Sequence, residues 1–413
     1  MTSSWKTYRI GELAEKVAMG PFGSNIKVET FVDKGIPIIS GSHLRGIRLF
    51  DHEYNFITVD HAERLKNSIV CAGDVVFTHA GNVGQVAVIP SNSMYPRYII
   101  SQRQFFLRCN TNLILPEFIT YYFHSREGKG KLLANVNSTG VPSLSQPTTY
   151  LKSIEIDVPS LEEQHSIVAI LDALTNKVVN NSKINHHLEQ MAQAIFKSWF
   201  VDFEPFGGKM PVDWHEGTIS DLGEVIGGST PSKAKPEYFT EHGIAWITPK
   251  DLSDSKSKFI AHGADDITEL GLQNSSARLM PRGAVLFSSR APIGYIAIAN
   301  CDVCTNQGFK SIVPNESVGT AFIYYFLMEN LQTIESMASG STFKEISGGT
   351  MKKVPAIIPD KDTLRHFQAE CTPIFEKQEL LEAENTCLAR IRDSLLPQLM
   401  SGELSIADID SVK

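Results

Sequence analysis

The 413-residue sequence predicts an α+β protein made of two similar, mostly-β domains, each followed by a long α-helix. Two observations carry this prediction: motifs recur in the same order in both halves of the chain, and each half ends in a stretch with helical apolar spacing. We expect the two helices to pair as an antiparallel coiled coil. The predicted boundaries are 1–159 and 205–359 for the β-rich domains, 160–204 for the first helix, and 360–413 for the second helix with a C-terminal tail.

The recurring motifs form an internal repeat. Phe31-Val-Asp-Lys-Gly-Ile-Pro-Ile-Ile-Ser returns as Phe239-Thr-Glu-His-Gly-Ile-Ala-Trp-Ile-Thr, and Gly73-Asp-Val-Val-Phe-Thr returns as Gly283-Ala-Val-Leu-Phe-Ser. A period of roughly 200 residues is far longer than the units of stacked repeat proteins, so each copy is expected to be a domain. Within each copy, short β-branched and apolar runs are separated by Gly, Pro, Ser and Asn, which predicts mostly β structure.

The first long helix is predicted to begin at Ser160-Leu-Glu-Glu163, which has the pattern of a capping box. In such a box the serine hydroxyl accepts from an early backbone N–H, and the glutamate reaches back to the serine amide. From there about 40 residues would span roughly 60 Å at 1.5 Å per residue. Steps of four and three define a coiled-coil seam of Ile167, Leu171, Leu174, Val178, Asn181, Asn185, Leu188, Ala192, Ile195 and Trp199.

The second long helix repeats this spacing with more polar interruptions. Pro373 is expected to kink it or to restart it with Thr372 as the cap, and Pro397 lies near its end. Asparagines on the seams should lower stability but fix the register. The alternative is two separate amphipathic helices, each lying on its own domain. The second seam consists of Phe367, Cys371, Ile374, Gln378, Leu381, Asn385, Leu388, Arg392, Leu395 and Leu399.

Composition places the chain among cytoplasmic proteins. No apolar run approaches the roughly 20 residues of a membrane span, and the N-terminus lacks a secretory pattern, so we expect no membrane contact. Six scattered cysteines fit a reducing compartment. Cys301 and Cys304 have metal-ligand spacing, but no second pair accompanies them, so a buried strand pair is expected rather than zinc, and no metal site.

The net charge of −8 is unusual for a nucleic-acid binder, because phosphate neutralisation normally requires a basic surface. The excess lies in the two predicted helical segments, which carry −3 and −5, whereas the β-rich domains carry +3 and −3. Any grip on DNA must therefore come from local clusters or from partners.

Motifs for catalysis are missing from the sequence. Gly227-Gly-Ser-Thr-Pro231 lacks the lysine of a phosphate loop, and neither a glycine-rich dinucleotide turn nor His-Glu-x-x-His is found. The Asn/Asp-Pro-Pro-Tyr/Phe segment of amino-methyltransferases is also missing. We therefore expect a non-catalytic chain that binds no cofactor itself.

Several segments resemble the specificity subunit of Type I restriction-modification enzymes, over essentially the full chain. Leu161-Glu-Glu-Gln-His-Ser-Ile-Val-Ala-Ile-Leu-Asp172 is similar to the start of that family's first spacer helix, and Ala194-Ile-Phe-Lys-Ser-Trp-Phe-Val-Asp-Phe203 to its end. Leu395-Leu-Pro-Gln-Leu-Met-Ser-Gly-Glu-Leu404 resembles the end of the second helix. Met210-Pro-Val-Asp-Trp214, followed by Ile219-Ser-Asp-Leu-Gly223, resembles the start of the second recognition domain.

The resemblance implies a DNA-binding specificity subunit of a phage-defence system. Each target recognition domain would read one half of a bipartite, asymmetric site, and the helices would set the spacing. The implied partners are double-stranded DNA, two modification (methyltransferase) subunits and restriction (translocase/nuclease) subunits, which would bind S-adenosylmethionine, ATP and Mg. The alternatives are a targeting subunit of a methylation-only or other defence complex, and a non-DNA coiled-coil scaffold with two binding lobes.

Loops at matched positions in the two copies are the candidates for DNA contact, because polar side chains on protruding elements read base edges and phosphates. The alternative is that paired residues are turn residues that both copies need to fold. Positions that match in place but differ in chemistry, Asn82 against Pro292 and Arg103 against Gly308, would produce different half-sites. The candidates in the first copy are Gly23, Ser24, Ser42, His43, His79, Asn82, Gln102, Arg103, Lys129, Lys131, Ser138 and Thr139. Those in the second copy are Ser229, Thr230, Lys250, Asp251, Ser289, Arg290, Asn306, Gln307, Ser341, Thr342 and Lys344.

Overall fold

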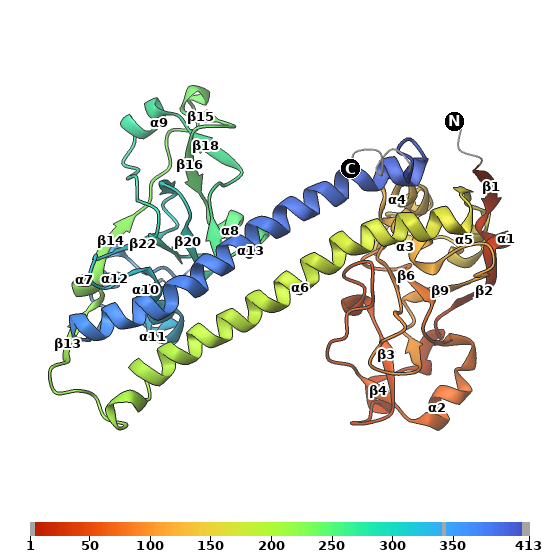
Figure 1. The fold of residues 1–413 in the computed structure, drawn as a ribbon, viewed down its shortest axis with the longest axis horizontal. Coiled ribbons are helices and arrows are strands. Elements are labelled where there is room, and N and C mark those ends of the chain that lie inside the picture. Colours follow the sequence, from red (N-terminus) through yellow and green to blue (C-terminus); the bar gives the residue numbers. More distant parts are fainter. Residues whose placement is uncertain (1–4, 341–343, 407–413) are drawn as a thin grey trace. The chain divides into compact units, whose positions relative to one another are not determined.

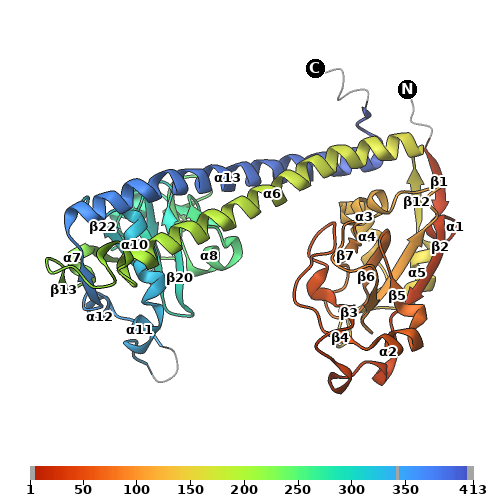
Figure 2. The ribbon, with the colours of Figure 1, turned by 60° about the horizontal axis from the view of Figure 1, so that its bottom comes forward.

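The computed structural model describes residues 5–340 and 344–406, apart from the side chain of Ser24. The chain divides into two units, each containing a β-rich lobe and parts of two long helices (Figures 1 and 2). Unit 1 comprises residues 1–177 and 387–413, and unit 2 comprises residues 178–386. Sheets and helices occur together in each unit, as the predicted α+β class requires.

The lobe of unit 1 is layered. Its four-stranded sheet β2-β9-β6-β7 has α3 and α4 on one face and the sheet β4-β3-β8-β5 on the other. Alternation along β6 explains this arrangement, because Val75 and Phe77 join the core with α3, whereas Val76 packs with the second sheet. The strands are β2 (Ala14–Met19), β9 (Gln104–Cys109), β6 (Asp74–Thr78), β7 (Val86–Val88), β4 (Phe56–Ile57), β3 (Ile36–Ile39), β8 (Tyr98–Ile100) and β5 (Ile69–Val70). The helices are α3 (Pro116–His124) and α4 (Arg126–Leu133).

Shorter elements complete this lobe. The antiparallel pair β1 and β12 joins its first strand to the last strand before the long helix, and β10 pairs with β11. These elements are β1 (Lys6–Arg9), β12 (Glu155–Val158), β10 (Val136–Asn137), β11 (Ser143–Leu144), α1 (Ile10–Leu13), α2 (Val59–Arg64) and α5 (Pro147–Ser153).

The lobe of unit 2 repeats this architecture with the sheets β14-β22-β19-β20-β17 and β15-β18-β16-β21. Phe287 packs towards the helices and Leu286 towards the second sheet, the same alternation as in β6. The strands are β14 (Gly223–Gly227), β22 (Lys310–Pro314), β19 (Val285–Ser289), β20 (Ile293–Ala299), β17 (Phe259–Ile260), β15 (Phe239–Thr240), β18 (Asp265–Ile267), β16 (Ile244–Ile247), β21 (Val303–Thr305), β13 (His215–Thr218) and β23 (Pro355–Ile358). The helices are α7 (Ile219–Leu222), α8 (Pro249–Ser255), α9 (Glu269–Gln273), α10 (Thr320–Glu329), α11 (Leu331–Ser336) and α12 (Gly348–Met351).

The same close backbone approach occurs in both copies of the repeat. A Cβ atom on Gly20 would lie 2.0 Å from the carbonyl oxygen of Ser101, and one on Gly228 would lie 1.9 Å from that of Asn306. Only glycine fits at these two places, because any side chain would overlap the backbone. Ser101 and Asn306 therefore occupy equivalent positions in the two copies.

The long helices are α6 (Leu161–Phe200) and α13 (Lys361–Ser401). The Ser160 hydroxyl accepts from the amide of Glu163 at 3.2 Å, as expected for a cap, but the Glu163 carboxylate accepts from the Trp5 indole at 3.2 Å. Helix α13 continues through Pro373, so the restart at Thr372 was wrong. The Thr372 hydroxyl instead donates back to the carbonyl of Gln368 at 2.7 Å, and the buried Cys371 and Ile374 hold the helix in place on both sides of the proline.

The two helices run antiparallel to one another. In unit 2, Asn181 Nδ2 donates to Glu384 Oε2 at 2.8 Å, and Asn185 Nδ2 donates to Glu382 Oε1 at 3.3 Å. In unit 1, the start of α6 and the end of α13 share one core, to which Leu171 and Leu399 both belong. All described seam positions are buried or half-buried. The alternative of two separate helices was therefore wrong.

Candidate nucleic-acid interface

Both lobes carry the same arrangement of turns, which we call the loop frame. In unit 1 it consists of Gly20, the turn 79–84, the turn 101–103 and Ser143; in unit 2 it consists of Gly228, the turn 289–294, the turn 306–308 and Glu345. Several of the backbone bonds that join these segments have a counterpart in the other unit. His79 N donates to Arg103 O at 2.9 Å as Ser289 N donates to Gly308 O at 2.7 Å, and the bridge Ala80–Ser143 matches the bridge Arg290–Glu345.

In unit 1 the loop frame presents four of the candidate residues. Asn82, Gln102 and Arg103 are exposed, and Arg103 Nη1 lies 3.4 Å from the place that a Cβ of Gly81 would take. His79 is half-buried and its Nε2 lies 3.1 Å from the carbonyl oxygen of Gln102. Burial lowers the pKa of His79, so its imidazole is neutral at neutral pH. The positive charge of this frame is therefore that of Arg103.

In unit 2 the loop frame presents Arg290 and Gln307, whereas two of its candidates are occupied internally. Ser289 is buried and its hydroxyl donates to the carbonyl of Gly308 at 3.0 Å. Asn306 Oδ1 accepts from the Gly308 amide at 2.8 Å. The exposed Gln307 accepts a hydrogen bond from the Thr230 hydroxyl. Ser289 and Asn306 therefore shape the turn, and Arg290 is the charged side chain among the sequence-predicted candidates of this frame.

The pairs Ser42-His43 and Lys250-Asp251 occupy equivalent turns, and their second members cap them. Ser40 N donates to His43 Nδ1 at 3.0 Å, and Thr248 N donates to Asp251 Oδ2 at 2.7 Å. His43 is 2% exposed and stacks on Tyr54 with ring centroids 4.3 Å apart. The side chains of His43 and Asp251 therefore bond to the backbone of their own turns. Their neighbours Lys250 and Ser42 are both exposed.

The remaining candidates lie away from the loop frames or on their edges. Lys131 is engaged within unit 1, because its ammonium pairs with Glu127 at 2.8 Å and donates to the carbonyl of Glu155 at 2.9 Å. Ser229 is half-buried, and the exposed residues of this group are Gly23, Lys129, Ser138, Thr139 and Lys344. The side chain of Ser24, and Ser341 and Thr342, lie outside the described residues.

Sequence reasoning missed two charged residues of the second loop frame. Lys310 begins β22 at the place that the buried Phe105 takes in unit 1, since Lys310 pairs with Gly227 as Phe105 pairs with Met19. Glu345 stands where unit 1 has Ser143. Lys310 Nζ lies 3.7 Å from Glu345 Oε1, and Arg290 Nη1 lies 3.5 Å from Glu345 Oε2. The available signal was the single lysine in the apolar run Phe309-Lys-Ser-Ile-Val.

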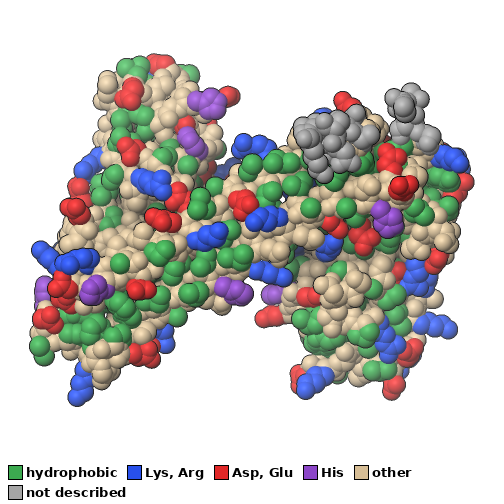
Figure 3. Space-filling model, in the orientation of Figure 1, with side chains coloured by type: hydrophobic (Ala, Val, Ile, Leu, Met, Phe, Trp, Pro, Cys, Tyr) green, Lys and Arg blue, Asp and Glu red, His purple; other side chains and the backbone are tan. Residues whose placement is uncertain are grey.

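Charge is mixed elsewhere on the surface. On the face drawn in Figure 3, basic and acidic side chains are interspersed over the described residues of both units. The absence of a broad basic field on this face agrees with the near-neutral lobes expected from the sequence, and it puts weight on individual cations such as Arg103 and Arg290.

In each lobe a basic residue at the short parallel contact with β7 or β20 binds the long helices. Arg48 faces Val88 of β7, whereas Lys258 lies one residue before Phe259, which faces Ile298 of β20. In unit 1, Arg48 Nη2 pairs with Asp172 on α6 at 2.6 Å, and Nη1 donates to Asn176 at 2.5 Å. The hydroxyl of Tyr121 donates to the other carboxylate oxygen of Asp172 at 2.8 Å.

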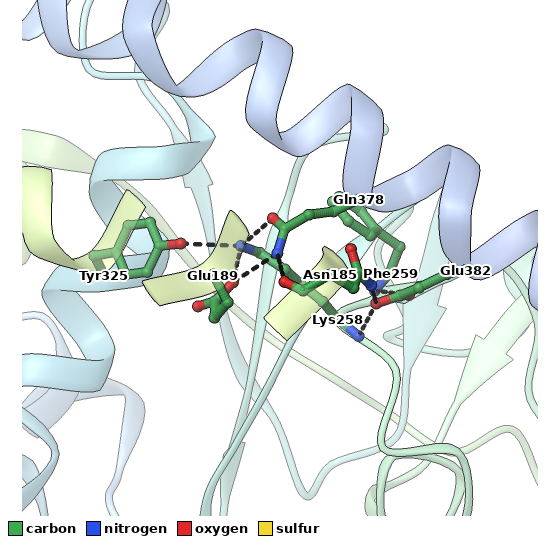
Figure 4. Close-up of polar contacts among 7 residues, drawn as sticks. All are labelled: Asn185, Glu189, Lys258, Phe259, Tyr325, Gln378 and Glu382. Carbon is green, nitrogen blue, oxygen red and sulfur yellow. Dashed lines mark hydrogen bonds and ion pairs between the residues drawn. The ribbon is translucent and has the colours of Figure 1, made fainter. Parts of the chain in front are cut away.

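In unit 2 the fastening is buried and involves both helices (Figure 4). Lys258, 8% exposed, donates to Glu189 of α6 at 2.6 Å, to Gln378 of α13 at 2.9 Å and to the Tyr325 hydroxyl at 3.1 Å. Glu382 of α13 accepts from the backbone amides of Lys258 and Phe259, each at 3.2 Å. Burial lowers the pKa of Lys258 and raises that of Glu382, because both charges lose hydration.

Metal-ligand residues do not gather in the described part of the chain, where no group of three or more His, Cys, Asp or Glu is placed to hold an ion. Cys304 is buried on β21, and the Cys301 thiol, in the preceding turn, donates to the carbonyl of Ala261 at 3.1 Å. Only one of the two cysteines therefore lies in a strand. Among residues 5–340 and 344–406, none of the helices is both long and apolar enough to cross a membrane.

Comparison with known proteins gives a consistent result. The family model described as "Type I restriction modification DNA specificity domain" matches residues 2–190 and 211–386. The HindI specificity subunit of Haemophilus influenzae is 24% identical, with 97% of this chain and 100% of that protein covered. The MjaIX specificity subunit of Methanocaldococcus jannaschii is 41% identical over 47% of this chain and 45% of that protein. The crystal structure of a Mycoplasma genitalium S subunit shares the fold, with a TM-score of 0.63 at 16% identity and coverage of 97% and 96%.

Proposed function

Because the chain belongs to the family of Type I restriction modification DNA specificity domains, we propose that it is the DNA-targeting subunit of such a system and reads a bipartite, asymmetric site. The observation that carries this proposal is the pair of loop frames. Their backbone bonds correspond, while the side chains they present differ: Ala80 against Arg290, Arg103 against Gly308, Asn82 against Pro292. Frames that share these backbone bonds but present different side chains suit two domains that read two different half-sites.

The helices are proposed to set the spacing between the half-sites. Antiparallel helices joined through a polar seam have a fixed register, so their length defines a distance. Seven residues add about 10 Å of helix, and one turn of DNA, about 10 base pairs, takes about 34 Å. A rod longer by seven residues should therefore lengthen the gap by about three base pairs.

The test inserts one heptad into both helices at matched positions, after Asn176 in α6 and after Cys387 in α13, so that the seam keeps its phase. Methylation profiling of the host genome should then give the same half-sites with a longer gap. The matched control inserts seven residues between Gly207 and Gly208, outside both helices, and should leave the gap unchanged. A heptad variant that methylates the original gapped site would refute spacing by the helices.

Partner subunits are proposed to supply all chemistry. The chain lacks the sequence motifs of a nucleotide-dependent motor or a methyltransferase, so two modification subunits would carry S-adenosylmethionine and restriction subunits would carry ATP and Mg. Such a complex works where the genome is, in the cytoplasm. With purified subunits, methyl transfer should require a modification subunit, while exchanging this chain for a relative should change the site methylated. Methyl transfer by this chain alone would overturn its non-catalytic role.

A further inference from the structure

Each loop frame holds one arginine, and the two arginines enter the frame from different segments. In unit 1, Arg103 comes from the turn before β9 and lies over Gly81 of the neighbouring turn. In unit 2, the equivalent of Arg103 is Gly308, and Arg290 comes from the turn between β19 and β20. Both frames therefore contain an arginine, but the two arginines occupy different positions in the frame.

Arg290 is held more loosely than every other arginine of unit 2. Arg278, Arg282 and Arg365 lie 2.7, 2.7 and 2.6 Å from their carboxylate partners, whereas Arg290 lies 3.5 Å from Glu345. Charge-assisted hydrogen bonds between guanidinium and carboxylate are normally about 2.7–2.9 Å long. Glu345 therefore orients Arg290 without saturating its donors.

Glu345 also pairs with a second cation, Lys310, which weakens its interaction with Arg290. Lys310 approaches it at 3.7 Å and contacts Ser289 Oγ and Gln307 O at 3.4 Å each. The Lys310 side chain is only 14% exposed, whereas those of Arg290 and Glu345 are each 38% exposed. The lysine is thus built into the frame, and the arginine is the cation that can turn outward.

We propose that Arg290 is the base-reading residue of unit 2 and binds guanine in the major groove, and that Glu345 holds it when the correct base is absent. The inference rests on the proposed function. A guanidinium can donate two parallel hydrogen bonds to O6 and N7 of guanine, a pattern no other base offers at that edge. Opposite any other base Arg290 keeps its contact with Glu345, so the carboxylate adds to discrimination by competing for the arginine.

The experiment uses the chain in complex with its modification subunits. The wild-type recognition site is first read from the methylated bases of a genome. Binding is then measured on that duplex and on a set in which each base pair is replaced in turn. The variants are Arg290→Ala, Arg290→Lys and Glu345→Gln, with Arg278→Ala as the control from the same lobe. Arg278 has a tight surface partner in Glu224 and should leave the whole pattern unchanged.

For Arg290→Ala and Arg290→Lys we expect the preference for guanine to fall at one position of one half-site, by about ten- to a hundred-fold. Lysine keeps the charge but loses the bidentate geometry, so it separates base reading from general attraction. Glu345→Gln should bind the substituted duplex several-fold more tightly while losing little on the correct one. Arg103→Ala should act on the other half-site.

The outcomes are distinguishable from failure of the proposed function. If the wild-type complex produces no gapped methylation motif, the proposed function itself is refuted. A gapped motif with no guanine that responds to either Arg290 variant would overturn the inference alone. Equal weakening on all duplexes, with a salt dependence reduced by about one phosphate contact, would make Arg290 a backbone contact and would also overturn it.

Discussion

The two lobes repeat one backbone but are fastened to the long helices by different chemistry. Arg48 in unit 1 is one-third exposed and contacts α6 alone, through Asp172 and Asn176. Lys258 in unit 2 is buried and contacts both helices, and Glu382 adds two bonds to the backbone beside it. The two lobes thus share their strand order, but the residues that bind them to the long helices differ in length and burial. Removing Lys258 should therefore lower stability more than removing Arg48 does.

The largest effect is expected from Lys258→Met. The change leaves the Glu189 carboxylate without its cation in a half-buried site, where its Oε1 already lacks a partner, and a loss of about 3–5 kcal/mol of stability is typical. Denaturant unfolding monitored by fluorescence suits the measurement, because Trp199, Trp214 and Trp246 all lie in unit 2.

Two further variants sharpen that test. Lys377→Met removes an exposed lysine from α13 and should change stability by less than about 0.5 kcal/mol. Adding Glu189→Leu to Lys258→Met should restore much of the loss, because replacing both members of a buried pair is often neutral. If Lys258→Met lowers the free energy of unfolding by less than about 1 kcal/mol, the contacts of Lys258 do not hold the lobe on the helices.

A smaller effect is expected from Arg48→Ala in unit 1. The guanidinium makes charge-assisted bonds to α6, but its partial exposure reduces their value, and Tyr121 continues to bond Asp172, so about 1–2 kcal/mol should be lost. Hydrogen exchange of the β7 amides reports this lobe specifically. Arg9→Ala, which removes a fully surface ion pair with Glu155, is the control and should leave exchange unchanged. Equal protection in both variants would contradict the role of Arg48.

The smallest effect concerns the caps of the two helices and depends on pH. Partial burial of Asp360 opposes ionisation, but the bonds that its carboxylate accepts from Thr363, Trp214 and Asp362 more than compensate and lower its pKa. Its contribution is therefore present above the ordinary carboxyl pKa and disappears as pH falls through the lowered value. Asp360→Ala should cost about 1 kcal/mol at neutral pH.

The equivalent cap in unit 1 is a serine and supplies the comparison. Ser160→Ala should cost a similar amount, about 1 kcal/mol, that does not change between pH 7 and about pH 3. Thermal unfolding of both variants across that range measures the difference. A Ser160 effect with the same acid dependence as Asp360 would argue against titration of the cap carboxylate.

Sequence reasoning recovered the repeat, the helices and their pairing, because these depend on spacing along the chain. Leu171 and Leu399 were assigned to a shared seam from their periodicity alone, and both lie in one core. The restart at Thr372 was wrong because local proline chemistry was outweighed by the burial of Cys371 and Ile374 on the same helix. Tertiary packing at such a site has no signature in a short window of residues.

The fastenings and much of the candidate interface could not be predicted. Lys258 meets Glu189 and Gln378 across 69 and 120 residues, so nothing near it in sequence marks it as buried. His43 and Asp251 share a capping role despite unlike chemistry, which made them look like divergent reading residues. Arg290 was identified from its matched position, but its loose partner Glu345 becomes visible only when the frame is assembled.

In unit 1 the first described residue packs against the segment that follows α13. Trp5, near the start of the chain, lies 3.3 Å from the place that a Cβ of Gly402, near its end, would take. Trp214, the counterpart of Trp5, packs against Phe206 in the connection that follows α6. In unit 1 the two segments that meet at Trp5 are therefore far apart in sequence, whereas in unit 2 the equivalent segments are joined by the connection that follows α6. A circular permutant that joins the present termini with a short linker and begins between Gly207 and Gly208 should fold with both lobes intact.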